Sequence, residues 1–110
     1  MKHTLLIITA LMLVVGCSNA QTYQFAETFY DNGLPKFIKT FKESKGKFEL
    51  VKSISLYSNG QKRSEWTYKD GELDGQVTWW YENGQKDWED TFKDGEFIER
   101  TYWNEDGNKR

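Results

Sequence analysis

The sequence predicts an all-β protein: an antiparallel meander of successive β-hairpins in a single elongated sheet, preceded by a signal peptide. The first observation is a repeat of about 24 residues, because segment 57–62 returns as 81–86 and segment 68–73 returns as 92–97. The second is the Asn-Gly or Asp-Gly pair inside each segment, which is the strongest short-range hairpin signal. A fixed period of this length is typical of stacked supersecondary units.

The start of the chain predicts export and lipidation. Lys2 and His3 precede an apolar run at 5–15, which is too short to cross a bilayer core of ~30 Å as a helix and has the length of a signal-peptide core. The run ends in Gly16-Cys17, which resembles the lipobox of bacterial lipoproteins, where the cysteine is acylated and becomes the first mature residue. The alternatives are a transmembrane anchor or a plain signal peptide with an incidental cysteine. The expected organisation is a lipoprotein signal peptide at 1–16, a lipidated tether at 17–22 and a β-hairpin repeat domain at 23–110.

Cys17 is the only cysteine, so no intrachain disulfide can form. Lipidation would explain a lone cysteine in an exported domain, and two or three acyl chains make a lasting membrane anchor. By the same resemblance, Ser18 after the cysteine implies sorting to the outer membrane, and the acidic run that directs some lipoproteins to the cell surface is absent. We therefore expect a lipid-anchored protein of the cell envelope, on the periplasmic face of the outer membrane.

The repeat can be followed in weaker form on both sides of the clear copies. Its hairpin turns are expected at five pairs: Asn32-Gly33, Asn59-Gly60, Asp70-Gly71, Asn83-Gly84 and Asp94-Gly95. Two-residue loops there would set Tyr57 against Lys62, Tyr81 against Lys86, Tyr68 against Leu73 and Phe92 against Phe97. In the first copy, Pro35 after the turn favours an edge strand or a looser turn, and the polar stretch 43–47 is expected to form a longer loop. The last copy is irregular, as end repeats that cap a stack often are.

Aromatic residues at fixed distances from the turns are the best core candidates. Three positions before the glycine stand Tyr30, Tyr57 and Tyr81; eight positions after it, Phe41, Tyr68 and Phe92. All 18 aromatic residues follow the predicted signal peptide, and each can bury ~150–250 Å². Strand alternation sets Trp79 opposite Trp88, places Trp66 on the same face, and places Trp80 on the other face.

The segments Tyr-x-Asn-Gly-Gln-Lys and aromatic-Lys-Asp-Gly-Glu, with Trp79-Trp80-Tyr81 between them, resemble the MORN-type repeat. The likeness is closest to the bacterial variety found in YwqK-type proteins, often labelled antitoxin components, and it covers 57–97 well. It implies successive hairpins in an elongated sheet and a motif without catalytic residues. The antitoxin label implies a protein partner, which for an exported chain fits an immunity-type role better than neutralisation of a cytoplasmic toxin.

The expected mature chain lacks the residues for most enzymatic chemistry. The only histidine, His3, leaves with the signal peptide and Cys17 would be acylated, which removes Ser-His and Cys-His catalysis and the usual zinc sites. A glycosidase-like pair could be drawn only from the carboxylates Glu65, Asp87, Glu89 and Asp90, which read better as solvated strand positions. No calcium loop or phosphate loop is present, so we expect no metal, no cofactor and no catalytic residue. The net charge of −2 without a basic patch argues against nucleic acid.

The sequence therefore predicts a non-enzymatic lipoprotein that presents a repeat surface to another protein. The alternative is a glycan or cell-wall binder, since exposed tryptophans stack on sugar rings. The candidate binding surface consists of Trp66, Trp79, Trp80 and Trp88. Trp80 is the best contact candidate, because the other three are better explained as core.

Overall fold

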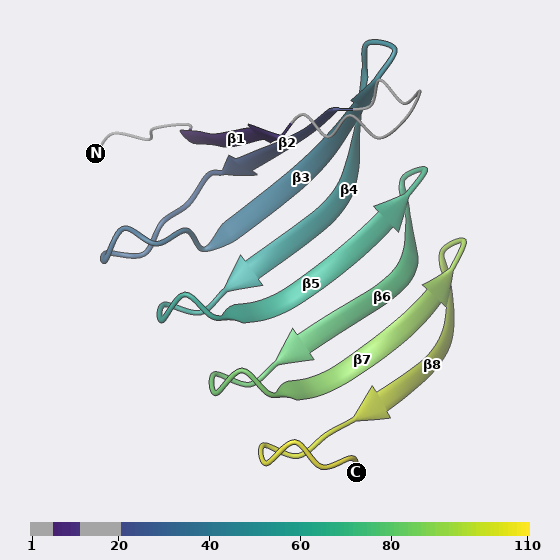
Figure 1. Ribbon diagram of the computed structural model, residues 1–110. Coiled ribbons are helices and arrows are strands. Elements are labelled where there is room, and N and C mark those ends of the chain that lie inside the picture. Colours follow the sequence, from purple (N-terminus) through teal and green to yellow (C-terminus); the bar gives the residue numbers. More distant parts are fainter. Residues whose placement is uncertain (1–5, 12–20) are drawn as a thin grey trace.

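The computed structural model describes residues 6–11 and 21–110, with side chains from residue 21 onward. These residues form one eight-stranded antiparallel sheet in chain order, without a helix (Figure 1). The prediction of an all-β meander of hairpins is thus confirmed. The strands are β1 (Leu6–Leu11), β2 (Gln21–Ala26), β3 (Phe37–Ser44), β4 (Lys47–Leu56), β5 (Lys62–Lys69), β6 (Glu72–Trp80), β7 (Lys86–Lys93) and β8 (Glu96–Tyr102).

The predicted lipid anchor lies outside the described residues, because these skip Cys17 and most of the expected tether. β1 falls inside the predicted signal peptide and pairs with β2. β2 begins at Gln21, so the last two residues of the expected tether belong to the sheet.

Tight turns join the strands at one end of the sheet. Asp70-Gly71 and Asp94-Gly95 adopt positive φ at both residues, which is the type I′ geometry that matches strand twist. The predicted pairs Tyr68 with Leu73 and Phe92 with Phe97 follow. The longer loop expected at 43–47 is wrong, since Lys45 and Gly46 form a third turn of this kind.

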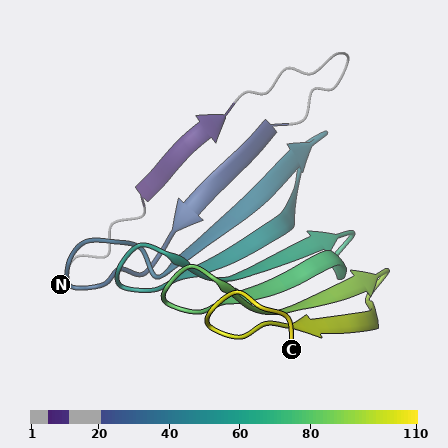
Figure 2. The same cartoon turned by 60° about the horizontal axis from the view of Figure 1, so that its bottom comes forward.

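Wider turns stand at the opposite end and stack in a row (Figure 2). Tyr57 N donates to Gln61 O at 2.8 Å, and Gly60 has a φ of 87°. A glycine in the left-handed region after a type I turn adds a residue to the loop. Leu56 therefore faces Lys62, and the expectation that Tyr57 does so is wrong.

The third copy shows the same correction, because Trp80 rather than Tyr81 faces Lys86. The looser turn favoured by Pro35 is not observed, since Tyr30 N donates to Leu34 O at 2.8 Å and Gly33 N to Tyr30 O at 2.9 Å, as in the other wide turns. Beyond this turn Phe29 and Pro35 form an isolated bridge, and β3 begins two residues later. Irregularities in the register recur in β1–β2 and in β3–β8. Such bulges bend strands and increase their twist, and the sheet is curved accordingly (Figure 2).

Each side of the sheet has its own chemistry. Residues that face each other across the strands share a side, and the registers collect most aromatic side chains on one side. We call this side the aromatic face: Tyr23, Phe25, Phe37, Phe41, Phe48, Trp66, Tyr68, Trp79, Trp88, Phe92, Phe97 and Tyr102. The other side, the polar face, carries Lys42, Glu49, Lys52, Glu65, Thr67, Thr78 and Glu89, with Trp80 at its rim.

Within the part of the chain that the structure describes, neither face is covered by a second layer. Among residues whose side chains are described, only Ala26 and Val77 are buried apolar residues, whereas Phe48 is 63% exposed and Phe97 55%. The predicted core tyrosines and phenylalanines, including Tyr57 and Phe41, are only half-buried. The reason is architectural: a sheet buries a face fully only when another layer packs on it.

Candidate functional site

The strictly repeated residues link each wide turn to the next. Tyr30 donates its hydroxyl to Leu56 O at 2.6 Å, Tyr57 to Trp80 O at 2.6 Å, and Tyr81 to Trp103 O at 2.9 Å. The turn asparagines repeat this with their amides: Asn32 to Ser58 O, Asn59 to Glu82 O, and Asn83 to Glu105 O. We call these bonds the turn ladder. The predicted turn residues are therefore scaffold, joining copies as well as reversing the chain.

The ladder ends at the last wide turn. Asn104 and Asp106 occupy there the tyrosine and asparagine positions, as the bonds Gly107 N to Asn104 O and Asn108 N to Asp106 Oδ1 show. Neither donates from its side chain to a further copy. These two substitutions are what makes the last copy irregular.

Two tyrosines of the ladder have a raised pKa. Burial raises the pKa of the Tyr57 hydroxyl above its ordinary value of 10.0. Burial and the neighbouring Asp87 carboxylate raise the pKa of Tyr81 in the same way. Because the folded state favours the protonated phenol, this contribution to stability is complete below about pH 10 and is lost as the pH rises through the folded-state pKa.

Replacing Tyr57 with phenylalanine is expected to lower the free energy of unfolding by about 1 kcal/mol, the typical net contribution of one hydrogen bond. In a domain of this size that loss lowers Tm by about 4–8 °C. The matched control is Tyr68→Phe, since the Tyr68 hydroxyl has no hydrogen-bond partner among the described residues. Thermal denaturation at pH 7 and pH 11 measures the Tm of the unchanged protein and of both variants. Equal Tm values for the two variants at pH 7 would contradict a stabilising ladder. Between pH 7 and pH 11 the Tyr57 variant should lose less stability than the unchanged protein, because it lacks the titrating hydroxyl.

A stack of rings and guanidinium groups crosses the aromatic face from β5 to β8. Trp79 and Trp88 stack with ring centroids 5.6 Å apart and an interplanar angle of 24°. Arg63 lies 5.9 Å from the Trp79 ring and Arg100 lies 4.3 Å from the Trp88 ring. Such cation–π contacts add to stacking. The sequence prediction that Trp79 and Trp88 pair across strands is confirmed.

Arg100 is also held by a buried carboxylate. Asp90 is 4% exposed and accepts two hydrogen bonds from the guanidinium, from Nε to Oδ1 and from Nη2 to Oδ2 at 2.7 Å. This bidentate pair raises the pKa of Arg100 far above the accessible range, mainly through the hydrogen bond to Asp90. All three arginines of the chain contact rings here, because Arg110 lies 5.0 Å from the Tyr102 ring.

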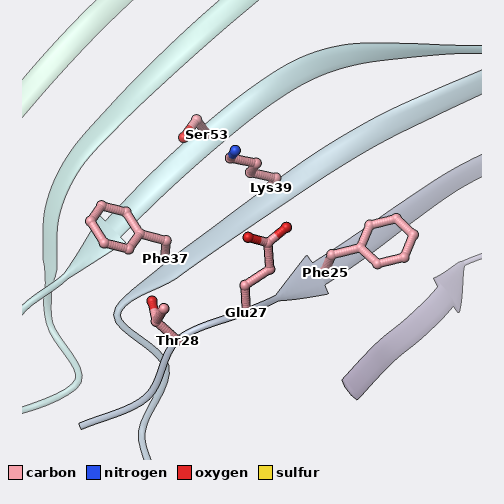
Figure 3. Close-up of a pocket in the computed structure, with 6 residues that line it drawn as sticks. All are labelled: Phe25, Glu27, Thr28, Phe37, Lys39 and Ser53. Carbon is pink, nitrogen blue, oxygen red and sulfur yellow. The ribbon is translucent and has the colours of Figure 1, made fainter. Parts of the chain in front are cut away.

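The other end of the aromatic face is hollowed. A cavity of about 340 Å³ is lined by residues of β2, β3 and β4 and of the segment after β2: Phe25, Glu27, Thr28, Phe37, Lys39 and Ser53 (Figure 3). A second hollow of about 420 Å³, lined by Phe25, Glu27, Phe41 and Phe48, adjoins it through shared residues. The phenylalanine rings give both hollows apolar walls, and Glu27 and Lys39 place charges at their rim.

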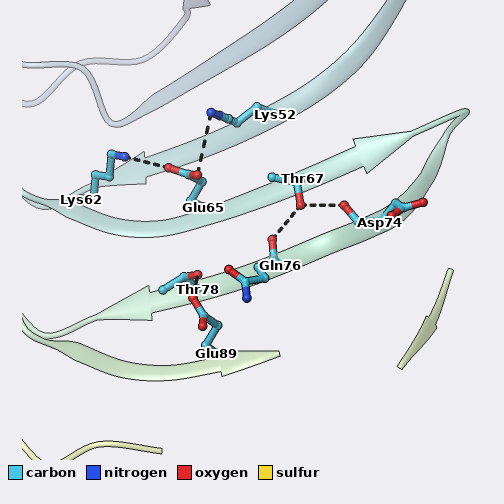
Figure 4. Close-up of polar contacts among 8 residues, drawn as sticks. All are labelled: Lys52, Lys62, Glu65, Thr67, Asp74, Gln76, Thr78 and Glu89. Atoms are coloured by element: carbon cyan, nitrogen blue, oxygen red, sulfur yellow. Dashed lines mark hydrogen bonds and ion pairs between the residues drawn. The ribbon is translucent and has the colours of Figure 1, made fainter. Parts of the chain in front are cut away.

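The polar face is a network of ion pairs and hydroxyl bonds (Figure 4). Glu65 pairs with Lys62 at 2.8 Å and with Lys52 at 3.9 Å. Glu89 accepts from Thr78 at 2.8 Å and pairs with Lys86 at 3.0 Å. Exposed pairs of this kind contribute little each, but together they satisfy the charges of this face.

A groove at the rim of the polar face surrounds the predicted contact residue Trp80. It measures about 410 Å³ and is lined by Gly60, Gln61, Lys62, Trp80 and Gly84. The Lys62 ammonium lies 5.6 Å from the centre of the Trp80 ring. The indole is therefore half-buried and already in contact with a cation of the same chain.

The structure divides the four predicted surface tryptophans between the faces. Trp66, Trp79 and Trp88 lie on the aromatic face and Trp80 at the polar rim, as strand alternation predicts, and all four are half-buried. The four candidate acid–base carboxylates do not form an isolated pair. Each has a cationic partner, and Asp87 reaches Arg110 at 4.0 Å.

Sequence reasoning missed the three arginines on the aromatic face. Arg63 lies at a shift in the β4–β5 register, which no residue pattern announces. Within residues 6–11 and 21–110, no group of three or more acidic, histidine or cysteine side chains could hold a metal ion. The same residues contain no helix long and apolar enough to cross a membrane.

Comparison with known proteins gives no match: no protein-family model, no curated protein and no solved structure resembles the chain significantly. Function must therefore be argued from the surfaces described above.

Proposed function

We propose that the chain is a membrane-anchored lipoprotein of the cell envelope, acylated at Cys17, that binds another protein through its repeat sheet and catalyses no reaction. The observation that carries the proposal is the uncovered aromatic face. Phe37, Phe48, Phe97 and Tyr102 on this face are each more than a third exposed. A large exposed apolar patch on a soluble domain marks an interaction surface more often than an accident of folding.

The charges on this face suit a protein partner. Arg63 contacts the Trp79 ring and donates to Ser55 Oγ at 3.3 Å, and no carboxylate pairs with it among the described residues. Aromatic residues and arginines are enriched where protein interfaces are most strongly held. A MORN-like scaffold of the YwqK type, with an immunity-type partner, is consistent with this chemistry.

A second candidate is a glycan of the cell wall, held at the Trp80 groove. The observation in its favour is that the groove places the Trp80 ring beside the amide of Gln61 and the ammonium group of Lys62. These are residue types that bind sugars. Against it, Lys62 already lies over the ring. The behaviour of Trp80→Ala, described in the Discussion, decides between these readings.

The anchor is tested by Cys17→Ser. We expect the variant to leave the membrane fraction, whereas the unchanged protein stays in it, because the acyl chains supply the membrane affinity. Immunoblotting of fractionated cells measures this, with Ser18→Ala as the control that keeps the cysteine. A Cys17→Ser protein that remained with membranes would remove lipidation from the proposal.

Protein binding is tested by crosslinking in intact cells followed by affinity purification from solubilised envelopes. A specific partner should be recovered with the unchanged protein and lost with Phe97→Ser, which alters the aromatic face but not the anchor. Recovery of no specific protein would overturn the proposed interaction.

A further inference from the structure

The outer edge of β2 accepts a strand. Residues 6–11 pair antiparallel with it, from Leu6 opposite Ala26 to Leu11 opposite Thr22. The occupant of this edge is thus an extended apolar segment, with the sequence Leu-Ile-Ile-Thr-Ala-Leu. Figure 2 shows it at the rim of the sheet beside β2, with β3 on the other side.

This occupant belongs to the segment that the proposed function removes. Cleavage before Cys17 would take away the whole of β1, so the inference rests on that processing. The backbone N–H and C=O groups of β2 on that side would then lose their strand partner. Unpaired edge groups are a ready template for another strand.

The β2 edge lacks the usual protection against such pairing. Its six residues, Gln-Thr-Tyr-Gln-Phe-Ala, include no charge and no proline. The opposite edge differs, because β8 carries Glu96, Glu99 and Arg100, and Arg110 N donates to Tyr102 O at its end. Charged side chains are the common device that keeps edge strands from pairing. Of the two edges, only the β2 edge would therefore allow another strand to pair with it.

Side-chain hollows lie beside this edge. Phe25 contacts Phe41 with ring centroids 5.6 Å apart, and Tyr23 contacts Phe48 at 5.7 Å. The 420 Å³ hollow among Phe25, Phe41 and Phe48 opens on the aromatic face next to β2. A strand added to an edge projects alternate side chains to each face, so every second residue of such a strand would point toward these rings.

We propose that the processed protein binds an extended segment of a partner protein as an added antiparallel strand on β2, with large apolar side chains at alternate positions against Phe25, Phe41 and Phe48. Main-chain hydrogen bonds supply affinity in this mode and the hollows supply selectivity. The hollow in Figure 3 continues the same surface, where Glu27 and Lys39 can meet charges that flank the segment.

The test uses the processed protein in lipid nanodiscs and a labelled peptide with the sequence of residues 6–11. Intact mass first shows whether residues 1–16 are gone; if they are retained, both the proposed processing and this inference are wrong. Fluorescence anisotropy then measures peptide binding, with empty nanodiscs subtracted. A processed protein that fails to bind overturns the strand inference alone.

Two N-methylated peptides separate strand addition from nonspecific apolar contact. One is methylated at Ala10 and the other at Leu11, which are neighbours in the regular part of the pairing beyond the register shift between Ile7 and Thr9. In an antiparallel pair only alternate N–H groups point at the acceptor strand, so one peptide should bind like the parent and the other should lose affinity by about tenfold or more. Equal binding of the two would overturn the inference.

Side-chain selectivity is tested by Phe48→Ala, with Ile98→Ala as the matched control, because Ile98 is a similarly exposed apolar residue on β8, at the other end of the sheet from β2. We expect severalfold weaker peptide binding for the first and unchanged binding for the second. Equal effects would contradict the assigned hollow. Sedimentation of the protein as a dimer that the peptide dissociates would instead assign the edge to a second copy of the chain and overturn the proposed partner.

Discussion

Replacing Trp79 with alanine is expected to lower the free energy of unfolding by about 3 kcal/mol. This value is the lower end of the range for removing a large aromatic side chain from a core, because Trp79 is only half-buried. The substitution also ends the stack with Trp88 and the contact with Arg63. Urea denaturation followed by far-ultraviolet circular dichroism measures the loss.

Trp80→Ala is the matched control, since it changes the adjacent residue on the opposite face. Trp80 contacts Lys62, and its carbonyl, which accepts the Tyr57 hydroxyl, is kept in the variant. We expect a loss of about 1 kcal/mol or less, as for side chains outside a packed cluster. Equal losses at the two positions would mean that the faces do not differ in structural importance.

The folded Trp80→Ala protein then decides the glycan alternative. If the protein binds glycan through the Trp80 groove, the unchanged chain should co-sediment with purified cell wall and the variant should not. Absence of co-sedimentation, or equal co-sedimentation of both proteins, would remove this alternative.

Arg100→Met is expected to lower the free energy of unfolding by about 3 kcal/mol, because it leaves the Asp90 carboxylate buried without its partner. Breaking a buried pair from one side costs about 3–5 kcal/mol, and Arg100 is 38% exposed, which favours the lower value. The substitution keeps an unbranched side chain over the Trp88 ring, so the loss reports mainly on the charge.

The double variant Asp90→Leu with Arg100→Met is the control. Replacing both partners of a buried pair with apolar residues is often neutral or stabilising, so this protein should be more stable than Arg100→Met alone. The double-mutant cycle, measured by urea denaturation, isolates the coupling of the pair. Additive losses would show that Asp90 and Arg100 do not stabilise one another.

Strand pairing could be predicted from the sequence where the turn permits one geometry. Asp70-Gly71 and Asp94-Gly95 are preferred type I′ pairs, so Tyr68 with Leu73 and Phe92 with Phe97 were correct. Lys45-Gly46 makes the same turn, but lysine is uncommon at positive φ. The sequence therefore carried no signal for it.

The predictions near the wide turns failed by one residue, and the arginines were missed for a related reason. An Asn-Gly pair permits both a two-residue loop and a type I turn with a bulge, and the turn ladder favours the second by engaging the tyrosine hydroxyl. The accompanying shift in register places Arg63 on the aromatic face. Alternation alone gave the faces of Trp79 and Trp80 correctly, but it cannot tell how deeply a face is buried, because that depends on a second layer.

The turn ladder also determines where a further repeat could be inserted. A unit of 24 residues with tyrosine and asparagine at its wide turn, inserted before Asn104, could donate to the carbonyl groups of the last turn and accept from the Tyr81 hydroxyl and the Asn83 amide behind it. A unit appended after Asp106 would meet a turn where Asn104 and Asp106 replace the tyrosine hydroxyl and the asparagine amide of the ladder. The ladder can thus be extended from within, whereas the last described turn lacks the tyrosine and asparagine that join the copies before it.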